Sequence, residues 1–372
     1  MSYPLSSQFS RSTKQPDTRT YARQLALGAA LLLSTHAALA QSGVTIYGIV
    51  DTGFVHESGG RNGSVNKITG GIGSGSRLGF KGTEDLGGGM SALFVLESGF
   101  QSDTGAMGQG GLLFGRQSYV GLSGSQGTLT VGRQYTPHYT GFVLADPFAA
   151  GFAGNAANLA ANSGSRMDNT VKYVSPSFGG VSAEAVYGFG ENAGSNAMGR
   201  AWGGALAYAN GGLSLRLAHH NRNMDTPTVQ RSENAKNTLL SGSYDLKVVK
   251  FNFGYGINKG YGSSALNNAN AYGLAVAPTP TTDSRDLILG VTLPVGQHKL
   301  IASYIRKDDR TRFNQDASQL GLGYLYALSR RTELYTTVAR IWNRNGAGYT
   351  VGSAIETGSG DMAWNAGIRH TF

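Results

Sequence analysis

The sequence predicts an all-β fold, a transmembrane barrel of sixteen antiparallel strands. Three observations predict it. Side-chain character alternates with a period of two along many segments, and short and long polar connections alternate between those segments. Beyond residue 40, no apolar run reaches the 18 or so residues that a spanning helix needs. The 56 glycines among 372 residues also disfavour a helix-rich protein, because glycine destabilises helix interiors.

The first 40 residues differ from the rest of the chain. Four basic residues precede the apolar run at positions 25–33, and small residues follow at Ala38 and Ala40. This order predicts a secretory signal peptide over residues 1–40, with residues 41–372 as a single barrel domain. Cleavage would change the formal charge from +9 to +6, because four basic residues and one acidic residue are lost with the leader.

Alternation is clearest in the second half of the chain. In residues 249–257, Phe251, Phe253 and Tyr255 share one parity, whereas Lys250 and Asn252 share the other. Successive side chains of a strand point to opposite faces, so this segment has one apolar face and one polar face. The same pattern recurs in residues 213–218, 287–293, 320–328 and 364–372.

Sixteen strands fit the spacing of these segments and their connections, which suits strands of about ten residues. We expect the strands to start near Val44, Ser76, Gly89, Phe114, Thr128, Asn169, Val181, Ala201, Leu213, Lys236, Val248, Arg285, Gln297, Ser318, Thr332 and Met362.

The polar faces of these strands explain why the sheet should close. They carry Gly, Ser, Thr, Asn, Lys and Arg, and such groups cannot form a dry core because unpaired buried charges are too costly. If they line water, the apolar faces must meet lipid. A sheet in lipid has to close on itself, since an open edge leaves backbone groups unsatisfied. Sixteen strands leave an aqueous lumen.

Parity also places several charges in that lumen. Leu78 and Phe80 form the lipid-facing pair of one strand, so Arg77 and Lys81 face inward. The same argument places Lys172, Arg166, Glu97 and Glu184 inward. The parity of Arg116 is ambiguous. Arg133 shares parity with the apolar Leu129 and Val131, so a lumenal position requires a β-bulge.

Several sequence motifs occur along residues 41–372 and include both ends of that stretch. They are VTIYGIVDTG at 44–53, SRLGFKGTEDLG at 76–87, RQSYVGL at 116–122, VGRQ at 131–134, VKYVSPSFGG at 171–180 and the terminal RHTF. In order and spacing these motifs resemble the Gram-negative general porins, in particular their neisserial and β-proteobacterial branch.

The resemblance implies a homotrimer in the outer membrane of a Gram-negative bacterium, in contact with lipid and lipopolysaccharide, with short periplasmic turns and long extracellular loops. It implies passive passage of ions and small hydrophilic solutes, with anion preference or weak selectivity. It also implies that a third loop, residues 138–167, folds inward and presents Asp146 to a basic cluster at the narrowest point. By resemblance, Arg77, Arg116 and Arg166 match that basic cluster. We expect Lys81, Arg133 and Lys172 to join them at the constriction, faced by the acids Asp146, Glu97 and Glu184. The terminal Phe372 matches the family's signal to the outer-membrane assembly machinery.

Other functional classes find little support in the sequence. It contains no G-x-S-x-G, H-E-x-x-H or P-loop motif, so we expect no enzyme. We also expect no cofactor, no metal site and no nucleic-acid partner. The alternatives that stay open are a substrate-specific outer-membrane channel and an outer-membrane adhesin barrel.

Overall fold

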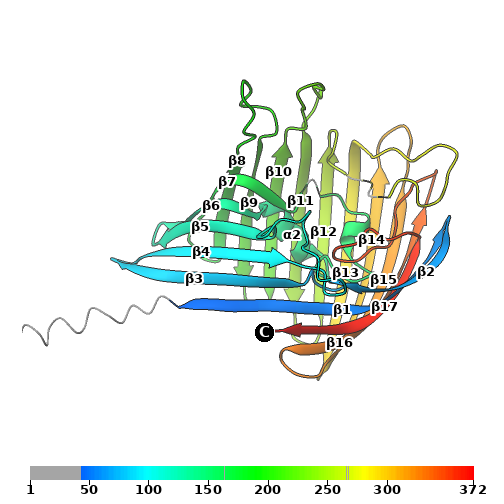
Figure 1. The fold of residues 1–372 in the computed structure, drawn as a ribbon, viewed down its shortest axis with the longest axis horizontal. Coiled ribbons are helices and arrows are strands. Elements are labelled where there is room, and N and C mark those ends of the chain that lie inside the picture. Colours follow the sequence, from blue (N-terminus) through cyan, green and yellow to red (C-terminus); the bar gives the residue numbers. More distant parts are fainter. Residues whose placement is uncertain (1–42, 163, 265, 267) are drawn as a thin grey trace, which may run out of the picture. The chain divides into compact units, whose positions relative to one another are not determined.

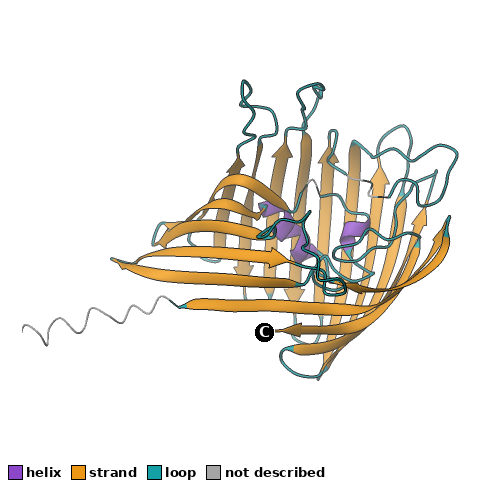
Figure 2. Ribbon diagram, in the orientation of Figure 1, coloured by secondary structure: helices purple, strands orange, loops and turns teal. Residues whose placement is uncertain are grey.

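A computed structural model describes residues 43–372, except residues 163, 265 and 267. The predicted signal peptide, residues 1–40, lies outside the described residues. Antiparallel strands dominate the described part, which also contains one α-helix and one short 3₁₀ helix (Figure 2). Neither of these described helices is long and apolar enough to cross a membrane.

Seventeen strand segments form one sheet. Their bounds are β1 (Val44–Gly60), β2 (Gly63–Gly70), β3 (Arg77–Gly87), β4 (Met90–Gly99), β5 (Gln117–Gly124), β6 (Gly127–Tyr135), β7 (Arg166–Val174), β8 (Val181–Gly188), β9 (Ala201–Asn210), β10 (Leu213–Arg222), β11 (Ala235–Asp245), β12 (Lys250–Lys259), β13 (Asp283–Val295), β14 (His298–Asp309), β15 (Ala317–Ala327), β16 (Thr332–Asn343) and β17 (Met362–Thr371). The helices are α2 (Pro137–Ala145) and η2 (Ala156–Asn158).

The sheet closes where β1 pairs antiparallel with β17, from Ile49 opposite Thr371 to Ser58 opposite Met362. On its other side, β1 pairs with β2 through its second half and with β3 through its first half. Together β2 and β3 therefore occupy the place of one strand beside β1. Counted in this way, the barrel has sixteen strands, as predicted. The predicted starts fall within three residues of the observed ones, but β2 was not predicted.

Asp51 of β1 binds the segment that separates β2 from β3. Its Oδ2 accepts hydrogen bonds from the backbone N–H groups of Gly73 and Ser74, each at 2.8 Å, and its Oδ1 accepts one from the Tyr335 hydroxyl at 2.6 Å. Asp51 is fully buried, so these bonds are what makes its position inside the wall tolerable. The excursion of residues 71–76 toward the interior follows from this carboxylate.

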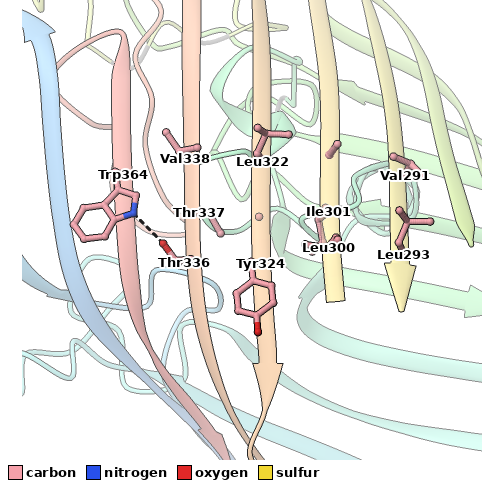
Figure 3. Close-up of a pocket in the computed structure, with 12 residues that line it drawn as sticks. Val291, Leu293, Leu300, Ile301, Leu322, Tyr324, Thr336, Thr337, Val338 and Trp364 are labelled. Atoms are coloured by element: carbon pink, nitrogen blue, oxygen red, sulfur yellow. Dashed lines mark hydrogen bonds between the residues drawn. The ribbon is translucent and has the colours of Figure 1, made fainter. Parts of the chain in front are cut away.

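Exposure follows the predicted alternation along the strands. On β12 the side chains of Phe251 and Tyr255 are 49% and 46% exposed, whereas Asn252 and Asn258 are 6% and 1% exposed. Figure 3 shows apolar side chains of β13 to β17 at the wall, with the Trp364 indole donating to the Thr336 hydroxyl at 2.9 Å. The outer face is thus an apolar skin suited to lipid, and the inner face is polar.

Short and long connections alternate as expected. Two residues join β9 to β10 and β13 to β14, whereas residues 260–282 join β12 to β13 and residues 344–361 join β16 to β17. The long connections of the green and yellow strands gather at one end of the barrel (Figure 1). A barrel of this kind has one end with tight turns and one with extended loops.

Candidate functional site

The segment between β6 and β7, residues 136–165, folds into the barrel, and we call it loop 3. It opens with α2, whose first turn is capped by Thr136: the side-chain oxygen accepts a hydrogen bond from the Tyr139 N–H at 3.1 Å. Pro137 occupies the first helical turn, where its missing N–H costs nothing. The loop was predicted as residues 138–167; the structure shifts these bounds by two residues and shows that the loop contains α2 and η2.

Loop 3 lies against the wall formed by β10 to β14. The Arg216 Nε donates to the Pro137 carbonyl at 3.1 Å, and the Asn252 amide donates to the Leu144 carbonyl at 2.9 Å. Further along, the Ser303 hydroxyl donates to the Gly154 carbonyl at 3.0 Å. The helices therefore lie within the ring of strands (Figure 2), where they narrow the lumen from one side.

Asp146 differs from its expected role as an acid presented to the pore. It is 2% exposed, and its carboxylate accepts hydrogen bonds from the backbone N–H groups of Phe148, Ala150 and Ala156 at 2.9–3.0 Å. Burial raises its pKa from 3.8 to about 6, although these three N–H groups favour the ionised form. Asp146 therefore closes the turn after α2 from within the loop.

Three of the predicted arginines come together at the base of loop 3, beside the end of β6 and the start of β7. The Arg116 Nε donates to Glu97 Oε1 at 2.7 Å, and its Nη2 donates to the Tyr135 hydroxyl at 2.7 Å. An Nη2 of Arg166 donates to the same hydroxyl at 2.7 Å. Arg77 interacts electrostatically with all of these groups. We call Arg77, Arg116 and Arg166 the arginine cluster.

Tyrosines organise this cluster. The Tyr135 ring stacks on Tyr139 of α2 at a centroid separation of 5.2 Å, which connects the arginines to loop 3. On the opposite side, the Tyr47 hydroxyl donates to Glu97 Oε2 at 3.0 Å, and the Lys81 ammonium lies 5.4 Å from the Tyr47 ring centroid. Glu97 thus accepts bonds on both oxygens and is 3% exposed, so its charge is already compensated.

A second charged group lies beside the start of α2. Glu184 pairs with Arg216 at 2.8 Å and with Lys172 at 3.5 Å. Lys172 and Glu184 were predicted to face the lumen, and the structure brings them into contact. Two cations thus share one acid.

Arg133 has different partners from the arginine cluster. The bulge that its lumenal placement required is present, since the register between β6 and β7 shifts between Gly132 and Gln134. Its side chain pairs with Asp168, and its Nε donates to the Gly115 carbonyl at 2.8 Å.

Sequence reasoning missed Tyr47, Tyr135 and Arg216. Tyr47 and Arg216 lie on the inward parity of their strands, so counting inward aromatic and basic side chains would have found them. Tyr135 ends β6, where parity gives no guide because the strand passes into loop 3. Arg116 stands one residue before β5, which explains its ambiguous parity.

Comparison with known proteins agrees with this geometry. The family model for Gram-negative porins matches residues 26–346. Outer membrane porin protein 32 of Delftia acidovorans is 32% identical over 92% of this chain and 98% of its own length. The major outer membrane protein P.IB of Neisseria meningitidis serogroup B is 27% identical over 92% of this chain and 98% of its own.

Among solved structures, the anion-selective porin from Comamonas acidovorans superposes with a TM-score of 0.72 at 29% identity, covering 89% of this chain and all of that one. The closed barrel, the inward-folded loop and the sequence matches agree with one another. The chain belongs to the Gram-negative porin family and is a general diffusion porin of the outer membrane.

Proposed function

We propose that this porin prefers anions. The observation that carries the proposal is the arginine cluster at the base of loop 3, together with the burial of the loop's single acid, Asp146, among backbone N–H groups. Arg77, Arg116, Arg166 and Lys81 are compensated only in part by Glu97. A narrow passage lined by one sign of charge raises the local concentration of counter-ions and selects among them.

Similarity adds support to this proposal. The solved porin from Comamonas acidovorans is described as anion-selective, and it matches this chain over its full length at 29% identity. The alternative of a barrel that serves as an adhesin gives no reason for arginines to gather in the interior.

The test is the reversal potential of the purified protein in a planar bilayer under a KCl gradient. We expect a reversal potential with the sign that results when chloride is more permeant than potassium. The potential should be smaller at high salt, because exposed charges are then screened over a few ångströms. Clear cation selectivity would overturn the proposal.

We further infer a homotrimer that passes small hydrophilic solutes, as the family resemblance implies. Conductance should then appear in three equal steps for each insertion, and the native mass in detergent should correspond to three chains. Single steps from a monomeric particle would contradict the trimer while leaving anion preference intact.

We also infer export by cleavage before Gln41, since residues 1–40 carry the features of a signal peptide. Mass spectrometry of protein isolated from outer membranes should find Gln41 at the amino terminus. A mature chain that retains residues 25–33 would contradict this.

A further inference from the structure

Loop 3 leaves and rejoins the wall at a base formed by the end of β6 and the start of β7. Tyr135, the last residue of β6, pairs there with Arg166, the first residue of β7. Beside this pair, the Thr136 N–H donates to the Ser165 carbonyl at 3.0 Å. The backbone of Tyr135 is therefore fixed by the pairing of the two strands, independently of its side chain.

The side-chain hydroxyl of Tyr135 accepts hydrogen bonds from two charged donors. Arg116 and Arg166 each donate to it through Nη2 at 2.7 Å. Two accepted bonds use both lone pairs of a hydroxyl oxygen, so the O–H proton of Tyr135 is left for a third group. In the part of the chain that the structure describes, this hydroxyl donates to no acceptor. Tyr135 therefore holds a donor that the described residues do not use.

The two arginines strengthen this unused donor. A bond accepted from a cation draws electron density from the hydroxyl oxygen, and neighbouring hydrogen bonds polarise one another. Arg166 also lies over the ring, with its Cζ 4.5 Å from the Tyr135 centroid. Both Tyr135 and Arg166 are partly exposed. An acceptor that approaches them meets two positive charges and one O–H donor, a combination that favours an anion.

An aromatic stack holds the Tyr135 ring in place. Tyr139 of α2 stacks on it at an interplanar angle of 14°, and Phe142 stacks on Tyr139 at a centroid separation of 6.4 Å. Phe142 is 1% exposed, so the stack starts in the packed interior of loop 3 and ends at the arginines. The ring position depends on this stack, so removal of the hydroxyl leaves the ring where it is.

We propose that Tyr135 determines the specificity of this channel together with the arginine cluster. Its oxygen positions Arg116 and Arg166, and its O–H group donates a hydrogen bond to each anion that passes the cluster. Tyr135 thus adds to anion selectivity without adding charge. The inference rests on the proposed anion preference, because a channel that selects cations brings no acceptor of this kind to the cluster.

The test compares Tyr135→Phe with the parent protein, both isolated from outer membranes and measured in planar bilayers under a KCl gradient. The variant keeps the charge of the cluster, the ring and the stack. We expect its chloride-to-potassium permeability ratio to be about threefold lower, which is the effect of losing one hydrogen bond of ordinary net strength. If charge alone set the selectivity, the ratio would not change.

The matched control is Tyr139→Phe, which removes a hydroxyl from the neighbouring ring of the same stack. Among the residues that the structure places, the Tyr139 hydroxyl has no hydrogen-bond partner. We expect this variant to keep the permeability ratio of the parent protein. Both variants should show the folded band of the parent on a detergent gel, because the strand pairing and the stack are retained.

A second readout separates the hydrogen bond from the effect of charge. Raising the mean KCl concentration from about 0.1 M to about 1 M shortens the screening length from about 10 Å to about 3 Å. The effect of Arg77→Ala, which removes a charge, should therefore shrink. The effect of Tyr135→Phe should persist, because a hydrogen bond acts only at contact.

The outcomes separate this inference from the proposed function. An anion-selective parent with equal ratios in Tyr135→Phe and Tyr139→Phe overturns the role of Tyr135 and leaves the anion preference standing. An effect of Tyr135→Phe that vanishes at high salt, or a loss of the folded band in that variant alone, overturns it as well. A cation-selective parent overturns the proposed preference itself. A lower ratio in Tyr135→Phe alone that persists at high salt supports the inference.

Discussion

At the scale of single residues, Arg116 combines two roles. It is 6% exposed, it neutralises Glu97, and it shares the Tyr135 hydroxyl with Arg166. Two guanidinium groups on one hydroxyl repel each other, and the Glu97 carboxylate offsets this repulsion. The cluster therefore keeps a net positive charge while its geometry stays fixed.

Replacing Arg116 by alanine should lower the anion-to-cation permeability ratio. One positive charge is lost and Glu97 loses its partner, so we expect a fall of about two- to fivefold at moderate salt. The ratio is obtained from reversal potentials in a KCl gradient, and Arg77→Ala should shift it in the same direction. Arg310→Ala serves as control because that arginine is 60% exposed and pairs with Asp308, two residues before it, rather than with a residue of the cluster. Unchanged selectivity in both cluster variants would remove these arginines from the constriction.

Asp146 should make stability depend on pH. Burial raises its pKa to about 6, above the value of 3.8 for an unfolded aspartate. The folded state therefore holds more protons between about pH 4 and 6, so stability rises as pH falls through this window and the gain is lost as pH rises through about 6. At pH 5 the gain over pH 7 should be about 1–2 kcal/mol for the parent protein and absent in Asp146→Asn. Thermal unfolding midpoints of both proteins at the two pH values give the comparison. Equal pH dependence would show that Asp146 titrates normally.

At the scale of elements, loop 3 is held by the wall as well as by its own turns. Asp286 of β13 accepts a hydrogen bond from the Ala161 N–H at 2.6 Å and another from the Asn258 amide at 2.8 Å. Its second oxygen pairs with Lys307 at 2.8 Å, and Lys307 is completely buried. The returning arm of loop 3 therefore depends on a buried ion pair between β13 and β14.

Removing only Lys307 from the Lys307–Asp286 ion pair should destabilise the barrel more than replacing both residues by uncharged ones. Lys307→Met leaves Asp286 charged and without its partner, at a cost of about 3 kcal/mol. Adding Asp286→Asn removes the stranded charge and keeps an oxygen for the Ala161 N–H, so part of the loss should be recovered. The temperature at which the folded band converts to the unfolded band on a detergent gel measures both. The exposed pair Arg310–Asp308 provides the contrast, since Arg310→Gln should cost less than about 1 kcal/mol. A double variant no more stable than the single one would contradict this account.

At the scale of the whole molecule, closure depends on the last residue as well as on β17. The Gly48 N–H donates to the Phe372 carbonyl at 3.2 Å, and the Phe372 N–H donates to the Gly48 carbonyl at 3.1 Å. The Phe372 ring occupies the space that a side chain at position 48 would need. Glycine at position 48 therefore allows Phe372 to pack against β1 where β1 and β17 close the barrel.

Phe372→Ala should separate assembly in the cell from stability of the finished barrel. The backbone bonds to Gly48 remain, so protein refolded in detergent should keep its folded band. If the ring is read by the assembly machinery, the amount of folded protein in outer membranes should fall severalfold. A variant that reaches the outer membrane normally would show that Phe372 is a packing residue only.

The sequence by itself determined the wall of this molecule. Alternation of period two places Phe251 outside and Asn252 inside, and this regularity predicts strand number, strand starts and the inward charges Arg77, Lys81, Glu97 and Glu184. Each such side chain depends on its own strand alone, because the pleat fixes its direction. The family resemblance added the inward loop and the grouping of Arg77, Arg116 and Arg166.

The tertiary structure decided the directions of side chains that lie outside the regular strands or at their ends. Arg116 lies outside the strands, Tyr135 and Arg166 stand at strand ends next to loop 3, and Asp146 lies within the loop, so their directions follow from contacts between distant segments. The break between β2 and β3 likewise depends on Asp51 meeting Tyr335 across 284 positions of sequence. Local periodicity carries no information about such contacts, which form only once the barrel has closed around its loop.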